Sequence, residues 1–393
     1  MGVAVDGQDN AIIGADSDGA YPGYSDPGLG GENVIIKFDP TGKQLWLREI
    51  GSGSEALQGV ATDAQSNIAV VSTTIGAFPG YSNPSGAPEG VVFKLDPNGK
   101  QLWLRQTAEA SLTSPQSIAT DPQNNVVVGS QWYSYAAGTS LFQGFYLTKL
   151  DGATGKTLWM HQYANGGVVN SIAIDRAGNI IVAGLGTLPA PPVDNPRQSF
   201  VAKIDGSTGG VIWVQPFASY SATAAVNFWS AAVDPQGDVI AGGAIDASAN
   251  PAFADGYGSF PSTQGLVAKL DGSTGGIVWA NQFATGKGEQ VFGVAADSNG
   301  NVLAVGVTSG VFAPPFTQPQ DINFAVKFDP NGQKVWVQQF GNGPLLSVTV
   351  TGYPQAAVDS RGDLYFGGET EGAFAGFSNP NNSVEMFLAK FGP

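Results

Sequence analysis

The sequence has no cysteine among its 393 residues, so disulfide bonds and cysteine-ligated metal sites are excluded, while the redox compartment stays open. Basic residues are few. The 17 Lys and Arg against 32 Asp and Glu give a net charge of −15, the wrong sign for a protein that wraps nucleic acid or an anionic membrane. No apolar run approaches the roughly 18 residues of a membrane-spanning helix. We therefore expect no nucleic-acid partner and no membrane insertion.

The N-terminus also lacks the basic segment and apolar core of a secretion signal. We expect such a signal to have been removed or never to have existed, and we place the protein outside the cytoplasm, as a secreted, periplasmic or cell-surface protein of bacterial origin. Glycine (55 residues) and proline (25 residues) are abundant, and only 12% of residues are charged. This composition indicates a turn-rich β protein.

Residues 291–340 show the pattern on which the rest of the chain is built. They contain four short segments rich in β-branched and aromatic residues, which we predict to be strands: Val291–Ala296, Asn301–Gly306, Phe324–Phe328 and Lys334–Phe340. The sequences DSNGN and DPNGQ predict tight hairpins after the first and third strands, and the second connection is long. The segment is therefore one small antiparallel sheet.

The pattern recurs seven times, at intervals of roughly 54–63 residues. An aspartate ends the first strand at Asp6, Asp63, Asp121, Asp175, Asp234, Asp297 and Asp359. A lysine marks the third strand at Lys37, Lys94, Lys149, Lys203, Lys269, Lys327 and Lys390. A tryptophan marks the fourth at Trp46, Trp103, Trp159, Trp213, Trp279 and Trp336, and the seventh unit has none. We assign the units to residues 1–52, 53–108, 109–165, 166–219, 220–285, 286–341 and 342–393.

Seven four-stranded units in tandem predict an all-β fold, a single seven-bladed β-propeller domain of four-stranded antiparallel blades over residues 1–393. The seventh unit ends before a fourth strand. Three explanations are open: an N-terminal strand that is missing here completes the blade, the blade has three strands, or a partner donates the fourth strand.

The units resemble the SBBP family of β-propeller repeats. The residues that carry the resemblance are GVAVD at Gly2–Asp6, the strand Asn301–Gly306, FVAKID at Phe200–Asp205 and the strand Gly332–Phe340. The resemblance covers essentially the whole chain and implies a propeller, but it implies no particular activity. A more local resemblance joins the turns DGATGKTLW, DGSTGGVIW and DGSTGGIVW to the tryptophan-docking turns of quinoprotein propellers, without their cofactor constellation.

The recurring lysines and tryptophans are interpreted as structural. A tryptophan once per blade fills the gap between neighbouring blades, and a residue present in every blade cannot mark a single catalytic site. Strand alternation places Lys203 and Asp205 on one face, so we predict an ion pair repeated around the ring. His161, the one histidine, holds a position that other repeats fill with Arg, Gln or Asn, so we interpret it as an ordinary strand residue.

Function is expected on the face that carries the long connections between second and third strands. Several of these loops share an AFPGY-like sequence, whose aromatic residues either contact a ligand or hold the loop against the blade. Five aromatic residues of units three to five are the ligand-binding candidates, which we place in or beside these loops: Trp132, Tyr133, Tyr135, Trp229 and Tyr257.

Calcium is the only cofactor for which the sequence offers ligands. Asp16, Asp18 and Asp26 could hold it together with loop carbonyls, or they could belong to a solvated turn. We expect a non-catalytic binding module that contacts a carbohydrate or a protein. Two alternatives stay open: a hydrolase or lyase with acidic residues in the central funnel, and a structural subunit that assembles through the open edge of blade seven.

Overall fold

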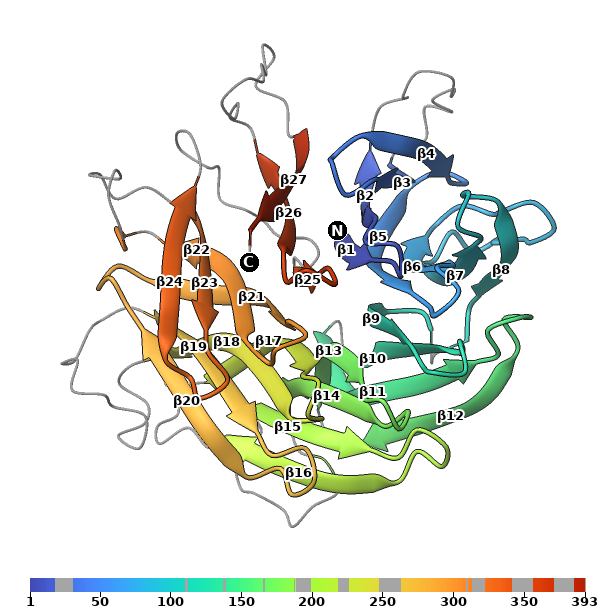
Figure 1. Cartoon of the computed structure of the whole chain (residues 1–393). Helices are drawn as coiled ribbons and strands as arrows, with labels where there is room; N and C mark the ends of the chain where they lie inside the picture. Colours follow the sequence, from blue (N-terminus) through green and yellow to red (C-terminus); the bar gives the residue numbers. More distant parts are fainter. Residues whose placement is uncertain are drawn as a thin grey trace. The chain divides into compact units, whose positions relative to one another are not determined.

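The computed structural model describes residues 1–17, 31–109, 112–136, 139–164, 167–186, 188, 199–217, 226–246, 263–308, 310–312, 322–340, 356–370 and 385–392. These residues form a seven-bladed β-propeller (Figure 1) and contain no helix. Six sheets have four antiparallel strands in chain order, and the sheet of blade seven has three. The predicted fold is confirmed, with a three-stranded last blade.

The strands follow the predicted pattern closely. In blades one to three they are β1 (Gly2–Val5), β2 (Ala11–Ser17), β3 (Glu32–Phe38), β4 (Gln44–Ile50), β5 (Glu55–Thr62), β6 (Ile68–Thr74), β7 (Glu89–Leu95), β8 (Gln101–Thr107), β9 (Pro115–Thr120), β10 (Val126–Ala136), β11 (Thr139–Leu150) and β12 (Thr157–Ala164). In blade four they are β13 (Val168–Ile174), β14 (Ile180–Leu185), β15 (Ser199–Ile204) and β16 (Val211–Phe217).

The last three blades contain β17 (Val226–Val233), β18 (Val239–Asp246), β19 (Thr263–Leu270), β20 (Ile277–Phe283), β21 (Glu289–Ala296), β22 (Val302–Thr308), β23 (Ile322–Phe328), β24 (Lys334–Phe340), β25 (Ala356–Val358), β26 (Leu364–Thr370) and β27 (Glu385–Phe391). The first strands of neighbouring blades contact one another, as β1 does with β5 and β17 with β21, so the first strand is the inner strand of its blade.

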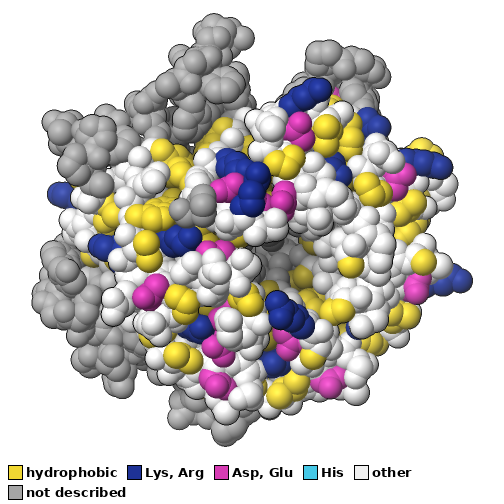
Figure 2. Space-filling model, in the orientation of Figure 1, with side chains coloured by type: hydrophobic (Ala, Val, Ile, Leu, Met, Phe, Trp, Pro, Cys, Tyr) yellow, Lys and Arg dark blue, Asp and Glu magenta, His cyan; other side chains and the backbone are white. Residues whose placement is uncertain are grey.

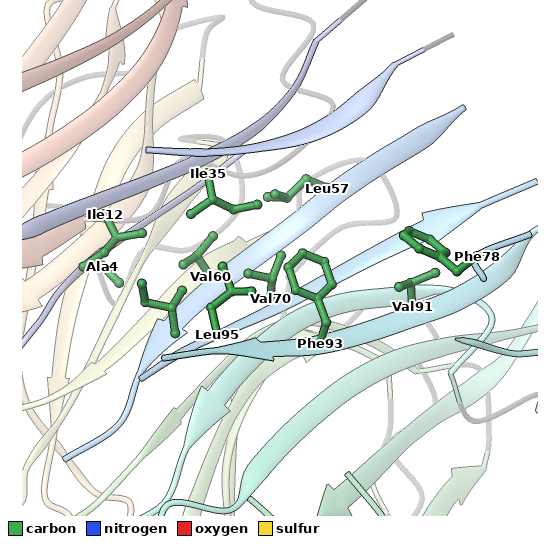
Figure 3. Close-up of a cluster of buried hydrophobic side chains, with 11 residues drawn as sticks. Ala4, Ile12, Ile35, Leu57, Val60, Val70, Phe78, Val91, Phe93 and Leu95 are labelled. Atoms are coloured by element: carbon green, nitrogen blue, oxygen red, sulfur yellow. The ribbon is translucent and has the colours of Figure 1, made fainter. Parts of the chain in front are cut away.

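The hydrophobic core lies between successive blades. One cluster joins Ile12 and Ile35 of blade one to Val60, Val70 and Phe93 of blade two, and all five side chains are buried (Figure 3). Comparable clusters join blades two and three, five and six, and six and seven. Because each sheet is apolar on both faces, a blade is stable only when it stacks between neighbours.

The chain divides into two compact units, which are considered separately below. Unit one comprises Met1–Ile180, Thr187–Pro192 and Ile204–Gly210, and unit two comprises Ile181–Gly186, Val193–Lys203 and Val211–Pro393.

Candidate functional site

The aspartate at the end of each first strand closes the hairpin that follows it. Asp6 Oδ1 accepts hydrogen bonds from the backbone N–H groups of Gln8 and Asn10, at 2.9 and 3.0 Å. The equivalent carboxylates make the same pair of bonds in the other six blades. Aspartate favours this position because its side chain satisfies backbone donors of its own turn.

The second oxygen of that aspartate holds the repeated lysine. Six pairs have Nζ–Oδ2 distances between 2.7 and 3.3 Å: Lys37–Asp6, Lys94–Asp63, Lys149–Asp121, Lys269–Asp234, Lys327–Asp297 and Lys390–Asp359. In the Lys94–Asp63 pair the two side chains are only 2% and 0% exposed. The predicted recurring ion pair therefore exists.

The predicted partner within that pair was wrong. Strand alternation suggested Asp205 for Lys203 and the equivalent residue elsewhere, yet six of the repeated lysines pair with the aspartate of the first strand, two strands away. Asp205 instead accepts hydrogen bonds from Ser207 and Thr208 in its own turn. A long lysine side chain lying across the second strand reaches the buried first-strand carboxylate, whereas Asp205 is at the exposed end of the third strand.

Hydrogen bonds keep the carboxylates of Asp121, Asp359 and Asp205 ionised. Burial alone would raise the pKa of Asp121, but hydrogen bonds from Lys149 and Asn125 outweigh burial and lower it. At Asp359, burial is likewise opposed by Arg361, by the Asp363 backbone and by Lys390, which bring the pKa to about 2. Side-chain and backbone hydrogen bonds from Ser207 and Thr208 lower the pKa of Asp205. These carboxylates therefore have pKa values unsuited to general acid catalysis near neutral pH.

The tryptophans dock on the next blade. The indole Nε1 of Trp46 donates to the Pro97 carbonyl at 3.0 Å, and Trp103, Trp159, Trp213 and Trp279 make the same bond to Gly152, Gly206, Gly272 and Pro330 at 3.0 to 3.2 Å. Lys37, Lys94, Lys149 and Lys203 donate to the same carbonyls as their blades' tryptophans. In these four cases one turn carbonyl of the following blade thus accepts both a lysine and an indole.

His161 belongs to this docking arrangement. It lies on β12, its ring centroid is 5.2 Å from that of Trp159, and a Cβ placed on Gly209 would be 2.1 Å from its Cδ2 atom. The histidine therefore covers the turn of the following blade, which supports its interpretation as a strand residue rather than a base.

The recurring aromatic loop is fully described in blade two, where its aromatic residues hold it to the blade. Phe78 is 4% exposed in the core between blades one and two. Its backbone N–H donates to Gln106 Oε1, and the Tyr81 hydroxyl donates to the Leu104 carbonyl at 2.7 Å. Phe312 of blade six makes the corresponding bond to Gln339. These contacts favour the interpretation that the aromatic residues hold the loop against the blade rather than contact a ligand.

Trp132 and its neighbours do not lie in a loop, contrary to prediction. Tyr133 and Tyr135 lie with Trp132 on β10, which forms with β11 a hairpin longer than any other pair of second and third strands. The partly buried Trp132 has its ring centroid 6.2 Å from that of Tyr146, at a bulge between Trp132 and Tyr133. The alternation of apolar and polar residues in SQWYSYAAGTSLFQGFYL could have predicted two long strands here. The prediction followed the loop-like sequences of the other units instead.

Beyond this bulge the hairpin is a two-stranded ribbon. β10 pairs with β9 only as far as Ser130, with one further bond from Gln131 N to Ser114 O, and β11 pairs with β12 only from Gly144 onward. In the part of the chain that the structure describes, residues 133–136 and 139–142 pair only with each other. We call these residues the blade-three ribbon.

Trp229 is also placed differently from the prediction, within the inner strand β17 rather than just before a strand. It is half-buried, and its ring centroid is 5.4 Å from that of Phe292 on β21. Phe292 was missed as a candidate. Both residues stand five positions before the repeated aspartate of their blades, where blades two, three and four have Gln58, Gln116 and Asn170. Aligning the repeats on that aspartate would have revealed this inner-strand aromatic pair.

The remaining candidates are only partly placed. Asp16 is exposed at the end of β2, while Tyr257, Asp18 and Asp26 lie outside the described residues. Within the described ranges there is no group of three His, Asp or Glu residues arranged to hold a metal. On the face shown in Figure 2 the described acidic and basic side chains are interspersed, as expected of short-range pairs.

Comparison with known proteins identifies the repeats. A family profile described as "Outer membrane protein assembly factor BamB" matches residues 31–252, more than half of the chain. The chain belongs to this family of propeller-repeat proteins. Its described residues include no helix long and apolar enough to cross a membrane. An uncharacterized WD repeat-containing protein of Acanthamoeba polyphaga mimivirus is 30% identical over 107 residues, 24% of this chain, and the match spans only 8% of that protein.

Three solved structures are similar to this chain at low sequence identity. The β-propeller domain of the Trilobed protease from Pyrococcus furiosus, described as having an open velcro topology, has a TM-score of 0.52 and 9% identity, with 100% of this chain and 96% of that chain covered. A protein of unknown function from Bacteroides caccae has a TM-score of 0.47 and 14% identity, with 84% of this chain and 93% of that chain covered. Quinohemoprotein alcohol dehydrogenase from Comamonas testosteroni has a TM-score of 0.45 and 13% identity. The similarity covers 92% of this chain and 61% of that enzyme.

Proposed function

We propose that this BamB-family propeller, with repeats of the SBBP type, is a non-catalytic module that binds another protein through the blade-three ribbon. The observation that carries this proposal is the length of the β10–β11 hairpin, whose outer part extends beyond both flanking strands.

A two-stranded ribbon that leaves its own sheet presents backbone donors and acceptors along both edges. An extended segment of a partner can pair with such an edge, which gives affinity through main-chain hydrogen bonds and specificity through alternate side chains. Trp132, partly buried at the base of the ribbon, provides an aromatic side chain of the kind that dominates protein interfaces. The ribbon thus combines a pairing edge with an aromatic anchor.

The family supports a protein partner over a carbohydrate. Its description names an assembly factor of outer membrane proteins, and we extend from it both the protein partner and a location outside the cytoplasm, where the chain is secreted, periplasmic or held at the cell surface. The net charge of −15 disfavours anionic partners.

The test is a ribbon-shortened variant in which an Asn-Gly turn replaces residues 133–143 and joins Trp132 to Gly144, which face each other in register. A partner captured from a cell-envelope extract is produced recombinantly, and its affinity is measured by calorimetry for the wild type and the variant. We expect binding to be lost in the variant while its melting temperature is retained. Trp229→Ala is the matched control and should still bind. A shortened variant that binds as tightly as the wild type contradicts the proposal.

The inner-strand aromatic pair favours a second candidate, a carbohydrate-binding role. Trp229, half-buried beside the buried Phe292, places an aromatic ring on an inner strand where three other blades have amides, and sugars stack on such rings. A glycan array probed with the wild type and Trp229→Ala, with calcium and with chelator, tests this role. Loss of glycan binding in the variant supports this role. Loss of glycan binding on chelation would show that the site also needs calcium, with Asp16 as one ligand. No binding in either condition rejects it.

A further inference from the structure

Glu289 of blade six is a buried carboxylate with one oxygen left over. It begins β21 and is 0% exposed. Its Oε1 atom accepts hydrogen bonds from the hydroxyls of Thr285 and Thr308, the second at 3.0 Å. Its Oε2 atom is also buried, and among the described residues it has neither a hydrogen-bond donor nor a cation as partner. Glu289 is therefore a buried acid whose second oxygen is available to a ligand.

The chain itself does not resolve this situation. Burying a carboxylate oxygen without a partner costs free energy, and burying its charge without a counter-charge costs more. A proton would not remove the problem: on Oε2 its O–H would need an acceptor there, and on Oε1 it would leave Oε2 without a donor. Lys287, two residues earlier, is exposed. A bound water could supply a hydrogen bond to Oε2, but only a bound cation supplies the charge as well.

Blade two shows the same carboxylate fully satisfied by its own chain. Oε1 of Glu55 accepts from the backbone N–H of Ser52 at 2.7 Å, and Oε2 accepts from that of Gly53 at 3.2 Å. These donors lie in the connection between β4 and β5, residues 51–54, whereas the connection between β20 and β21 is one residue longer, residues 284–288. In the longer connection a threonine hydroxyl is the donor, and it reaches only Oε1. The inserted residue therefore leaves Oε2 open in blade six.

The open oxygen lies at the base of the blade-six loop. The Thr308 hydroxyl, which donates to Glu289, accepts from the backbone N–H of Gly310 at 2.9 Å. The Gln339 side chain then donates to the Gly310 carbonyl and accepts from the backbone N–H of Phe312. The same chain of bonds exists in blade two through Thr74, Gly76, Gln106 and Phe78. A ligand held by Glu289 would thus fix Thr308 and the start of the loop.

We propose that Glu289, Thr285 and Thr308 bind a monovalent alkali cation, Na⁺ or K⁺, at Glu289 Oε2. Carboxylate and hydroxyl oxygens are hard donors of the kind that such cations prefer, and both hydroxyls keep a lone pair after donating to Oε1. One carboxylate balances one positive charge, whereas a divalent ion would bury an excess charge. Within the described ranges no group of three His, Asp or Glu residues is present to balance a divalent ion.

Thermal denaturation at constant ionic strength tests the proposal. The full chain is dialysed into choline chloride, whose cation is too large for a buried site, and choline is then replaced stepwise by NaCl or by KCl. We expect a saturable rise in melting temperature with at least one alkali cation, of about 1–2 °C per tenfold increase above half-saturation. The same melting temperature in all three chlorides would overturn the proposal and assign the partner of Oε2 to water. A rise with calcium chloride alone would overturn the monovalent assignment.

Variants locate the effect at Glu289. Glu289→Gln keeps the shape and removes the charge, so the saturable rise should disappear. Glu55→Gln is the matched control and should keep it, because both oxygens of Glu55 have donors within the chain. Thr285→Val removes one oxygen ligand and should raise the half-saturating concentration by roughly tenfold. A Glu289→Gln chain that responds like the wild type overturns the proposal.

A direct measurement keeps the proposal testable if these variants fail to fold. The wild type should broaden the ²³Na resonance of a sodium chloride solution, and KCl, but not choline chloride, should reverse the broadening. Broadening that choline reverses equally, or none at any sodium concentration together with no thermal effect of potassium, contradicts the site. The ribbon-shortened variant should respond like the wild type, which separates this proposal from that of the ribbon.

Discussion

Blade two and blade seven contain the same aspartate–lysine pair in different surroundings. Lys94 and Asp63 are almost fully buried at 2.8 Å, and Lys94 also donates to the carbonyls of Asn124 and Gly152. Lys390 is 30% exposed and lies 3.3 Å from Asp359 and 2.8 Å from Asp363. The fourth strand and the following blade's turn convert a partly solvated ion pair into a buried one, so the energy of the pair depends on its neighbours more than on its sequence.

The sharpest test of this comparison is the pair of substitutions Lys94→Met and Lys390→Met. Loss of Lys94 leaves the buried Asp63 carboxylate without its cation, so we expect the free energy of unfolding to fall by about 3–5 kcal/mol. Lys390→Met should cost no more than about 1 kcal/mol, because water reaches the lysine and Arg361 still pairs with Asp359 at 2.9 Å. Urea denaturation measures both. Equal losses would mean that the fourth strand does not govern the energy of the pair.

The docking turns provide a second contrast, between Gly275→Ala and Gly42→Ala. Both glycines have positive φ, so each substitution carries a similar backbone cost of about 1–2 kcal/mol. A Cβ on Gly275 would also lie 2.6 Å from Trp213 Cε3, and relieving that overlap should add about 1–3 kcal/mol. Thermal melts of the two variants measure the difference. A Gly42 variant that is as unstable as the Gly275 variant would show that its turn is covered.

Acid should weaken both kinds of blade. The pKa of Asp121 is lowered in the folded chain and that of Asp359 is about 2, while an unfolded aspartate has a pKa of about 3.9. Their contribution to stability is therefore complete above about pH 4 and is lost as the pH falls toward 2. Asp121→Asn and Asp359→Asn should each show a smaller loss of stability over this range than the wild type. A wild type that gains stability on acidification would contradict this assignment.

The smallest effect is expected in the blade-two loop, which depends on β8 for its anchors. Tyr81→Phe removes one hydrogen bond from a 40% exposed side chain to the Leu104 carbonyl, so we expect a loss of about 0.5 kcal/mol or less. Phe78→Ala, which empties a buried position, is the matched control and should cost about 3–5 kcal/mol. Differential scanning calorimetry resolves the two. A Tyr81→Phe variant that loses as much stability as Phe78→Ala would contradict the expectation that Phe78 is the stronger anchor of the loop.

Some of the candidate site could not be predicted from local pattern. The alternation around Lys203 correctly indicated an ion pair but selected Asp205, because alternation orders residues along one strand and says nothing about the strand two positions away. Trp132 was assigned to a loop because the equivalent segments of the other units are rich in Pro and Gly and were predicted to be loops. Trp229 was separated from Phe292 by 63 positions in sequence, and only the contact of β17 with β21 brings the two rings together.

The sequence by itself determined the number of blades, the four-strand pattern and the residues that recur in each blade, because periodicity and turn chemistry are local properties that repetition amplifies. The tertiary structure alone decided which carboxylate each lysine meets and which carbonyl each indole reaches. These depend on how sheets stack and on which backbone groups are left unpaired, and contacts between distant segments leave no mark in the pattern of any single repeat.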